Sequence, residues 1–537
     1  MMDATPGINA GDQARLIAAL RNPAVFGHAV ERVTIIETHI SYVLLTGAHA
    51  YKIKKAIALG FLDYSTLALR HACCERELRL NRRLAPAIYL DVVAITGSIA
   101  APSIDGDGPV LEYAVRMREF AQDALLSRLL ARGELTAATI DALASEVASF
   151  HGRVDVAPPD GAYGRPEGVL AVAADNFAQI CALQDDARER AELDALAAWT
   201  GREFAVRAEA MRQRRCLGFV RECHGDLHLG NVALVDSAIT IFDGIEFSGP
   251  LRWIDVMSEI AFVVMDLMDR GRRDFAHRFL NVYLELTGDY GGLAVLPFYL
   301  CYRAMVRAKV TCLRAAQLEP GEARAALIAE HRGYVDLARG FAQSSRPGIV
   351  ITHGLSGSGK TTLSQSLLEQ VGAVRVRADV ERKRLHGLAA GAHSASGVDQ
   401  GLYTADATRE TYLRARVLAR AVVGGGWVAV VDATFLLRWQ RDLFRQLAVE
   451  LDVPFVIVDL VAAEATLRER IRARGRLGRD ASEADIAVLE RQLQTREPLA
   501  PDEAADVVAC DAELPLAHST APDTWRAVIE RLGPRPR

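Results

Sequence analysis

The spacing of hydrophobic and polar positions changes near residue 120. Before this point, short apolar runs with the two-residue period of strands alternate with helical stretches at 13–20 and 66–84. After it, the period of helices dominates, with short strands between residues 231 and 242. The strand-like runs occupy 33–36, 42–45, 49–53, 89–95 and 110–115, and the helical patterns fill 123–150, 167–213 and 253–339. A strand-rich segment followed by a helix-rich one predicts an α+β bilobal domain.

Beyond residue 345 the pattern becomes a regular alternation of strand and helix. The polar segment Ala342-Gln-Ser-Ser-Arg-Pro-Gly348 precedes it and marks a boundary. We therefore predict one domain over 1–343 and a second over 347–537. The strand-like runs of the second domain occupy 348–352, 374–377, 427–431, 455–461 and 506–510. Their alternation with helices predicts an α/β fold with a parallel sheet covered on both faces.

Composition narrows the class of protein. The 537 residues are too many for one hydrophobic core, and the net charge of -5 gives no reason to expect a nucleic-acid partner. Eight cysteines without a C-x-x-C pair indicate neither a zinc site nor a disulfide framework, and they fit a reducing compartment. The N-terminus lacks the pattern of a secretory signal, and no apolar run approaches the roughly 20 residues that cross a bilayer. We therefore expect a cytoplasmic protein without a membrane partner.

The most specific motif is Gly354-Leu-Ser-Gly-Ser-Gly-Lys360-Thr361. It fits G-x-x-x-x-G-K-[ST] at every defined position, between a strand-like run and a helical pattern. In this context backbone N–H groups surround phosphate oxygens, and the helix N-terminus adds positive potential. Lys360 can reach the β- and γ-phosphates, and Thr361 can hold Mg²⁺. The predicted ATP-binding residues are Gly354, Ser356, Gly357, Ser358, Gly359, Lys360, Thr361 and Thr362.

Two carboxylates complete this downstream site. Asp432 ends the apolar run Val428-Ala-Val-Val-Val, which predicts a ligand of Mg²⁺. Asp379 and Arg382 follow the second strand of the domain, in a region that resembles small P-loop kinases such as gluconate kinase, polynucleotide 5′-kinase and zeta toxins. The resemblance implies that Asp379 is the catalytic base at the acceptor hydroxyl and that Arg382 binds substrate. The alternative is a helix N-cap aspartate beside solvated basic residues.

Six arginines crowd one segment of the second domain, at positions 468, 470, 472, 474, 476 and 479. In the P-loop kinases that the domain resembles, a lid helix carries arginines that close over the ATP phosphates, which suits the bidentate guanidinium group. Arg470 and Arg474 share a helical face, and we favour Arg474 and Arg479 as phosphate ligands. A solvated charged helix explains at least half of the six. A nucleic-acid groove is a third reading, but no aromatic residue interleaves the segment.

A second phosphate-transfer signature lies upstream, in His224-Gly-Asp226-Leu-His-Leu-Gly-Asn231 followed by Asp243. Phosphoryl transfer to an alcohol needs a carboxylate that orients or accepts the hydroxyl proton, and oxygen ligands for Mg²⁺. This spacing predicts that Asp226 is the base and that Asn231 and Asp243 hold the metal. His224 is expected to brace the loop, and His228 to position it rather than to bind a metal.

These residues resemble the group of aminoglycoside phosphotransferases, choline kinases and fructosamine kinases, which share the protein-kinase-like fold. The resemblance implies that Lys52 in Ala50-Tyr-Lys52 pairs with the α- and β-phosphates, with Lys54 as a weaker candidate. Glu77 is the implied partner of that lysine, and Glu75 is the second choice. The stretch Leu111–Met117 looks like the hinge between the lobes, which would make the backbone of Met117 an adenine ligand.

The chain departs from that group in two places. It has no glycine-rich loop of the protein-kinase kind. Asp243-Gly-Ile-Glu246 replaces D-F-G, so that Glu246 either joins the metal site or faces solvent. Asp255 resembles the position that bonds the catalytic loop in the family, which implies a structural role.

Taken as a whole, the chain resembles a bacterial family described as bifunctional aminoglycoside phosphotransferase-like and ATP-binding proteins. The resemblance implies an ATP- and Mg²⁺-dependent kinase with two active sites and small-molecule hydroxyl acceptors. One alternative is a P-loop ATPase or regulatory ATP-binding protein whose kinase-like half is an inactive scaffold. Another is a polynucleotide 5′-hydroxyl kinase.

Overall fold

The chain folds into two compact units, each assembled from segments that lie far apart in the sequence. The computed structural model describes residues 9–59, 62–184, 186–343, 346–390, 392, 402, 404–477, 484–515, 518 and 521–533. Unit 1 is formed from Met1–Thr139, Ser149–Arg165 and Arg214–Val263, and unit 2 from Ile140–Ala148, Pro166–Gln213 and Val264–Arg537.

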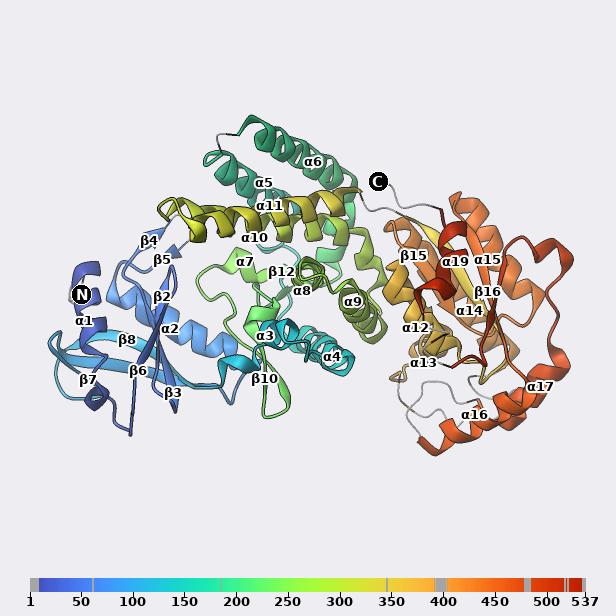
Figure 1. Ribbon diagram of the computed structural model, residues 1–537, viewed down its shortest axis with the longest axis horizontal. Coiled ribbons are helices and arrows are strands. Elements are labelled where there is room, and N and C mark those ends of the chain that lie inside the picture. Colours follow the sequence, from blue (N-terminus) through green and yellow to red (C-terminus); the bar gives the residue numbers. More distant parts are fainter. Residues whose placement is uncertain are drawn as a thin grey trace. The chain divides into compact units, whose positions relative to one another are not determined.

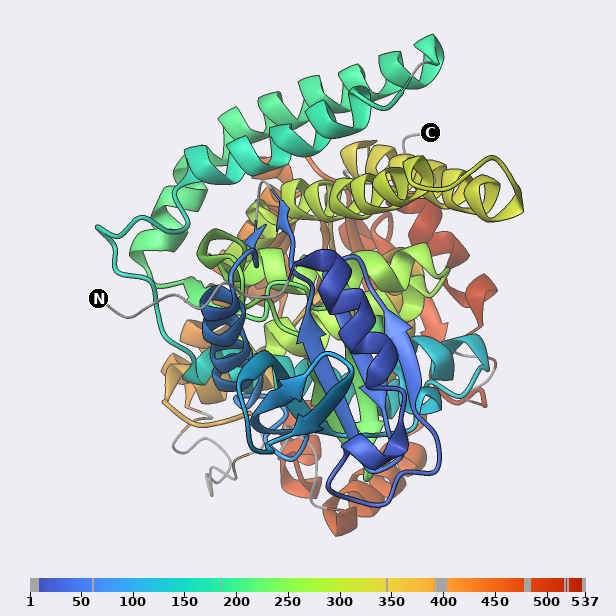
Figure 2. The same ribbon diagram turned by 90° about the vertical axis from the view of Figure 1, so that its left-hand side faces the viewer.

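Unit 1 contains an antiparallel six-stranded sheet in the order β1-β2-β3-β8-β6-β7 (Figure 1). Its strands are β1 (Thr34–Glu37), β2 (Ser41–Leu45), β3 (His49–Lys54), β6 (Tyr89–Ser98), β7 (Ala101–Ile104) and β8 (Val110–Arg118). Alternate residues of a strand point to opposite faces. In β3, Tyr51 and Ile53 therefore pack in one cluster with residues of α1 (Ala10–Ala19), whereas Lys52 and Lys54 pair with Glu77 of α2 (Leu67–Asn81). Figure 2 shows the backbone of this sheet and its helices in blue. A small hairpin, β4 (Ala58–Leu59) with β5 (Leu62–Asp63), leads into α2.

The rest of unit 1 combines two short antiparallel pairs with irregular loops. The hairpin of β10 (Val232–Val235) and β11 (Ala238–Ile241) was expected from the pattern. The pair of β9 (Val220–Glu222) and β12 (Trp253–Asp255) was not, because the local pattern of 253–255 is helical and the partner lies some thirty residues away. The short elements are η1 (Pro23–Val25), η2 (Gln122–Ala124), α3 (Leu126–Ala131), η3 (Leu229–Asn231) and α7 (Gly249–Arg252).

Two of the long helical patterns are interrupted. Gly133, with φ of 72°, follows α3, and the chain restarts as α4 (Ala137–Arg153) behind the Thr136 cap. The pattern at 167–213 becomes α5 (Pro166–Cys181) and α6 (Ala187–Cys216). The other helices of this region are α8 (Val256–Asp269), α9 (Arg273–Thr287), η4 (Tyr290–Ala294), α10 (Leu296–Ala316) and α11 (Glu322–Gln343), with α10 and α11 side by side.

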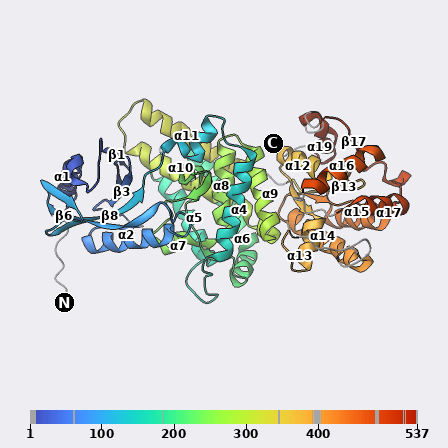
Figure 3. The ribbon, with the colours of Figure 1, turned by 90° about the horizontal axis from the view of Figure 1, so that it is seen from below.

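The second half of unit 2 has a five-stranded sheet in the order β14-β15-β13-β16-β17, and every ladder in it is parallel. The strands are β13 (Gly348–His353), β14 (Val374–Arg377), β15 (Val428–Asp432), β16 (Phe455–Val461) and β17 (Val507–Asp511). Figure 3 shows α12 (Lys360–Val371) and α19 (Arg526–Arg531) on one face, and α14 (Ala405–Gly424) and α15 (Arg438–Leu451) on the other. The remaining elements are α13 (Ala378–Leu385), α16 (Glu464–Leu477), α17 (Ile486–Thr495), η6 (Pro501–Glu503) and η7 (Pro522–Trp525). The predicted fold class, α+β followed by α/β with a parallel sheet, is confirmed.

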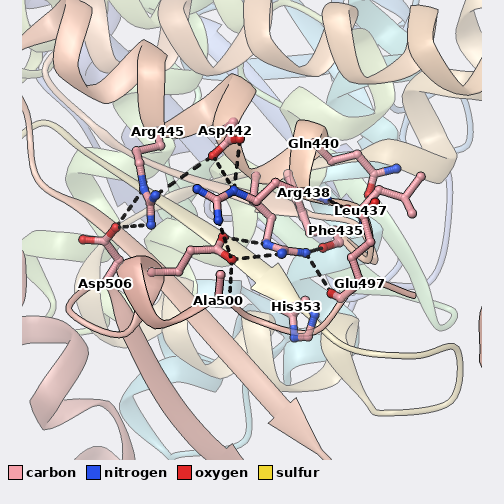
Figure 4. A network of polar contacts seen from close by, with 12 residues as sticks. His353, Phe435, Leu437, Arg438, Gln440, Asp442, Arg445, Glu497, Ala500 and Asp506 are labelled. Atoms are coloured by element: carbon pink, nitrogen blue, oxygen red, sulfur yellow. Dashed lines mark hydrogen bonds and ion pairs between the residues drawn. The ribbon is translucent and has the colours of Figure 1, made fainter. Parts of the chain in front are cut away.

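A buried ion pair fastens α15 to the chain that leads into β17. The guanidinium of Arg441 donates to both oxygens of Glu503 at 2.7 and 2.9 Å, and both side chains are buried. Glu503 also accepts from the N–H of Ala500. Arg445 pairs with Asp506 in the same network (Figure 4). A buried pair of this kind is well satisfied, so that removing one partner leaves an uncompensated charge.

In the described part of the chain, no helix combines the length and the apolar character needed to cross a membrane.

Candidate functional site

The predicted lysine–glutamate pair of the upstream site is formed in unit 1. Lys52 Nζ lies 2.8 Å from Glu77 Oε1 and is also paired with Asp243. The alternative partner, Glu75, is exposed and lies 3.7 Å from the ring of His71. Burial acts to lower the pKa of Lys52, but the charges of Asp243 and Glu77 outweigh it and hold that pKa well above its ordinary value. Lys52 is therefore a permanent cation.

Lys54 has a larger structural role than the sequence suggested. Its ammonium group is completely buried and joins the second oxygen of Glu77 to Glu246, which also accepts a hydrogen bond from Tyr64. Glu246 does not face solvent, because it is 3% exposed and paired with Lys54. Burial acts to raise the pKa of Glu246, and the two lysines outweigh burial and lower it.

We expect Lys54→Met to destabilise the protein by about 3–5 kcal/mol at pH 7, because it leaves buried carboxylates without the ammonium group that pairs with them. When the pKa of a carboxyl group is lower in the folded state than in the unfolded state, its ionised form stabilises the folded state at pH values above the unfolded-state pKa. This stabilisation is lost as the pH falls through the folded-state pKa. For Glu246 that window lies below its ordinary pKa of 4.5. In the variant the depression is relieved, so the gap between wild-type and variant denaturation midpoints should narrow as the pH falls below 4.5, the ordinary pKa of Glu246.

The control for this prediction is Lys55→Met, whose ammonium pairs with exposed Glu37. It should cost less than about 1 kcal/mol, as exposed pairs do. Equal losses for the two variants, or a gap that does not change with pH, would contradict the buried-network interpretation.

The predicted catalytic loop brings Asp226 and Asn231 into direct contact. Asn231 Nδ2 donates to the backbone oxygen of Asp226 at 3.0 Å and to its Oδ2 at 3.1 Å. His228 Nε2 lies 3.5 Å from the same carboxylate oxygen, and its Nδ1 accepts the N–H of Gly230 at 3.0 Å. His224 contacts the backbone oxygen of Phe242 at 2.8 Å. Both histidines thus shape the loop, as expected from the sequence.

The acidic residue that anchors this loop is Glu259, and not Asp255 as the family resemblance implied. Glu259 accepts the backbone N–H groups of His224 at 2.6 Å and of Gly225 at 2.8 Å. Asp255 instead forms a bidentate ion pair with Arg214, in which both hydrogen bonds are 2.8 Å long. Glu259 lies one helical turn further along α8, a shift that the motif could not reveal.

Asp243 lies just after β11 in a left-handed conformation, with φ of 65°. Its N–H donates to the hydroxyl of Tyr89 at 3.1 Å, and the next N–H, of Gly244, donates to Asn81. Burial acts to raise the pKa of Asp243, but Lys52 outweighs it, so the pKa is lowered and the group is ionised at neutral pH. A carboxylate and an asparagine amide oxygen are hard-oxygen ligands of the type that Mg²⁺ prefers, so the chemistry of Asp243 and Asn231 fits the metal.

The predicted hinge is displaced. Residues 111–117 lie inside β8, where they pair with β3 on one side and β6 on the other. Met117 itself opposes Ala50 and Tyr89 in the ladders. The chain leaves the sheet only after Arg118, so the segment that follows β8 is the better position for an interlobe hinge.

The downstream phosphate loop has the conformation that its glycines permit. Gly357 and Gly359 have φ of 86° and 84°, and a Cβ on Gly357 would lie 2.9 Å from the backbone oxygen of Leu467. Lys360 starts α12, and its Nζ donates to the backbone oxygens of Gly354 and Leu355 at 3.1 and 2.9 Å. The loop and the helix N-terminus together form a phosphate-sized cradle.

Thr361 and Asp432 meet at the floor of this cradle. The hydroxyl of Thr361 donates to Asp432 Oδ2 at 2.8 Å, although the two residues are 71 positions apart. A hydroxyl and a carboxylate in contact beside a phosphate loop are oxygen ligands of the type that binds Mg²⁺. The donor set therefore fits the predicted metal.

A cavity of about 770 Å³ opens above the loop. Its walls carry Asp379 and Arg382, whose side chains pair at 3.1 Å on α13. Asp379 is not the helix N-cap of the alternative reading, because Arg377 occupies that position. Other residues of the wall that the sequence did not single out are Tyr412, Trp439, Gln440, Arg491 and Gln492.

The described arginines of the arginine-rich segment occupy both surface and cavity positions. Arg468 pairs with Glu464 and Glu490 on the surface, whereas Arg470 lines the cavity near Gly359. Arg474 belongs to α16, but its side chain lies outside the described part of the chain, as does all of Arg479. Gln492 of α17 contacts the loop directly and accepts the N–H of Ser356 at 2.8 Å.

Comparison with known proteins adds independent evidence. An AAA domain model matches residues 349–499, which contain the phosphate loop and Asp432. The uncharacterized proteins Rv2004c of Mycobacterium tuberculosis (strain H37Rv) and Mb2027c of Mycobacterium bovis are each 30% identical over 462 residues, which cover 85% of this chain and 89% of the relative. The chain belongs to the family of these mycobacterial proteins. The predicted resemblance to a kinase-like domain followed by a P-loop domain is confirmed.

Solved structures similar to this family member match its two halves separately. A gluconokinase from Sinorhizobium meliloti is 24% identical and covers 33% of this chain and 89% of its own, with a TM-score of 0.24. An amicoumacin kinase in complex with AMP-PNP and Ca²⁺ is 13% identical, covering 61% and 96%, with a TM-score of 0.39. A choline kinase from Cryptosporidium parvum is 12% identical, covering 62% and 96%, with a TM-score of 0.37.

Proposed function

We propose that the protein is an ATP-dependent phosphotransferase with two nucleotide sites, one in each predicted domain (1–343 and 347–537). Each site would transfer the γ-phosphoryl group of Mg-ATP to a hydroxyl of a small molecule. The observation that carries the proposal is the downstream cavity, where the phosphate loop with Lys360 and the Thr361–Asp432 contact share one space with Asp379. A phosphate cradle, a metal ligand pair and a carboxylate base are the parts that phosphoryl transfer needs.

In the downstream site, Lys360 would leave its backbone acceptors and bind the β- and γ-phosphates. Thr361 and Asp432 would hold Mg²⁺, which neutralises charge on the phosphates. Asp379 would orient the acceptor hydroxyl and accept its proton, and Arg382 would steady Asp379 and bind the acceptor. Arg470, and by the sequence prediction Arg474 and Arg479, would lie over the phosphates. Catalysis here is mainly positioning and charge neutralisation.

In the upstream site, Lys52 would bind the α- and β-phosphates while Glu77 keeps its ammonium group in place. Asn231 and Asp243 would hold Mg²⁺, and Asp243 would exchange its pairing with Lys52 for the metal. Asp226, fixed by Asn231, would accept the hydroxyl proton. The backbone after β8 is the place at which we propose adenine binding, and Met117 becomes the residue that leads into it.

The rival proposal, a P-loop ATPase with an inactive kinase-shaped scaffold, requires the upstream machinery to be defective. The contacts speak against this, because Lys52 pairs with Glu77 and Asp243, and Asn231 contacts Asp226.

Binding stoichiometry tests the two-site proposal. Calorimetric titration of the full chain with Mg²⁺ and a non-hydrolysable ATP analogue should give two sites per chain. Lys52→Met and Lys360→Ala should each leave one site, and Lys55→Met, the control, should keep both. A single site in the wild type, removed only by Lys360→Ala, would contradict the proposal and favour the scaffold.

A further inference from the structure

The edge of the downstream sheet is completed by side chains of α9 and η4, which belong to the same compact unit but lie outside the matched 349–499 region. β14 is the edge strand, so its outer backbone groups need partners. Asn281 Nδ2 donates to the backbone oxygen of Ala373 at 2.9 Å, and its Oδ1 accepts the N–H of Arg375 at 2.7 Å. The hydroxyl of Tyr290 donates to the backbone oxygen of Arg375 at 3.2 Å. Asn281 and Tyr290 are both buried and thus substitute for a neighbouring strand.

Two glycines allow this part of the downstream domain to pack closely against α9 and η4. A Cβ on Gly372, which has φ of 78°, would lie 2.8 Å from the ring of His277. A Cβ on Gly425 would lie 2.9 Å from the backbone of Leu293. Arg278 of α9 reaches Glu369 of α12 at 3.1 Å.

Glu285 of α9 binds the two arginines that flank Val376 on β14. Its Oε1 accepts from Arg377 at 2.9 Å, and its Oε2 lies 3.7 Å from Arg375. Both guanidinium groups are nearly buried, and burial lowers the pKa of Arg375, which the charges of Asp432 and Glu285 oppose. Without Glu285, Arg375 would keep the charge of Asp432 but lose the second carboxylate that opposes the effect of burial, and Arg377 would lose the ion pair at 2.9 Å.

Each of the two arginines connects Glu285 to the phosphate site. Arg375 Nη1 donates to the backbone oxygen of Thr361 at 3.0 Å and to Ser364 Oγ at 3.2 Å, in the first turns of α12. Arg377 lines the cavity two residues before Asp379. One carboxylate therefore supports both the residue predicted to hold Mg²⁺ and the wall that carries the predicted base.

We propose that Glu285 is a positioning residue of the downstream site, so that this site is incomplete without the helices α9 and η4. The inference rests on the proposed function of that site. Glu285 does not reach the substrate itself. It fixes Arg377 and Arg375, and through them the acceptor side of the cavity and the start of α12.

The test compares Glu285→Gln with Asp274→Asn in the full chain. Asp274 is a matched control, because it lies on the same helix and pairs with the arginine two positions before it at the surface. Glu285→Gln should lower the Lys360-dependent kcat/KM for the acceptor about 10- to 100-fold, as misplacement of catalytic groups does. The KM for ATP should change less than twofold, and Asp274→Asn should behave as wild type.

A double-mutant cycle separates positioning from simple destabilisation. If Glu285 acts through Arg377, adding Glu285→Gln to Arg377→Gln should cause little further loss. Additive losses, or a Glu285→Gln variant with wild-type kinetics, would overturn the inference.

A second measurement keeps the inference testable if the wild type transfers no phosphoryl group, which would be a failure of the proposed function. Hydrogen exchange at the backbone of 374–379 should be at least tenfold faster in Glu285→Gln than in wild type and unchanged in Asp274→Asn. Equal exchange in all three proteins would overturn the positioning role.

Discussion

Lys360→Ala should reduce phosphoryl transfer by the downstream site at least a thousand-fold. Lys360 is the side-chain cation of the phosphate loop itself. Removing a preorganised neutral hydrogen-bond donor that stabilises transition-state charge already lowers kcat by about 10²–10³, and we expect the loss of a cation to lower it further. A loss of ATP affinity should accompany the loss of turnover, because the same ammonium group contacts the bound phosphates. The measurement is the initial rate of transfer at saturating and at limiting ATP, with the upstream site inactivated.

Arg472→Ala provides the control for this prediction, since it removes a cation from an exposed position of α16 in the same unit. It should keep the wild-type rate within about twofold, as substitutions away from structural features usually do. If Lys360→Ala retained more than a tenth of the wild-type rate, the phosphate loop would not be the site of transfer.

Asp226→Asn should reduce transfer by the upstream site by about 10²–10⁴-fold, the usual contribution of a positioned general base. The substitution is nearly isosteric, so the contact with Asn231 at 3.1 Å can largely persist while the charge is lost. Binding of Mg-ATP should be nearly unchanged, because Lys52, Asn231 and Asp243 remain. The expected pattern is therefore a fall in kcat with an unchanged dissociation constant for ATP.

Asp236→Asn is the matched control, because Asp236 is an exposed aspartate in the turn between β10 and β11 that pairs with Arg118 at the surface. Its upstream activity should equal that of wild type. Equal losses in Asp226→Asn and Asp236→Asn would show that the effect is one of folding and not of catalysis.

The sequence predicted those features that local pattern encodes. Gly354–Thr361 identifies its own loop and helix, and the apolar run ending at Asp432 marks a buried parallel strand. The pairing of Lys52 with Glu77 also followed from the sequence, because a strand lysine and a helix glutamate occupy positions that a known fold brings together.

The features that the sequence missed depend on contacts between distant segments. Glu259 and Asp255 are both acidic residues near the start of α8, and only the position of the backbone of His224 decides which of them anchors the loop. Lys54 was only the weaker candidate for the phosphate-binding lysine, and its structural role follows from Glu246, which is 192 residues away in the sequence and contacts it in the fold. Glu285 carried no motif at all, since its importance arises only from the arginines of an edge strand.

The central claim, that one chain carries two phosphotransferase sites, is tested most directly by transfer of labelled γ-phosphate from ATP. Wild type, Asp226→Asn and Lys360→Ala would be incubated with pooled sugars, small alcohols, aminoglycosides and oligonucleotides, and the products separated. The account predicts labelled small-molecule products, with one set lost in Asp226→Asn and another in Lys360→Ala. If wild type released only inorganic phosphate, and only Lys360→Ala stopped that release, the chain would be a P-loop ATPase with a kinase-shaped partner.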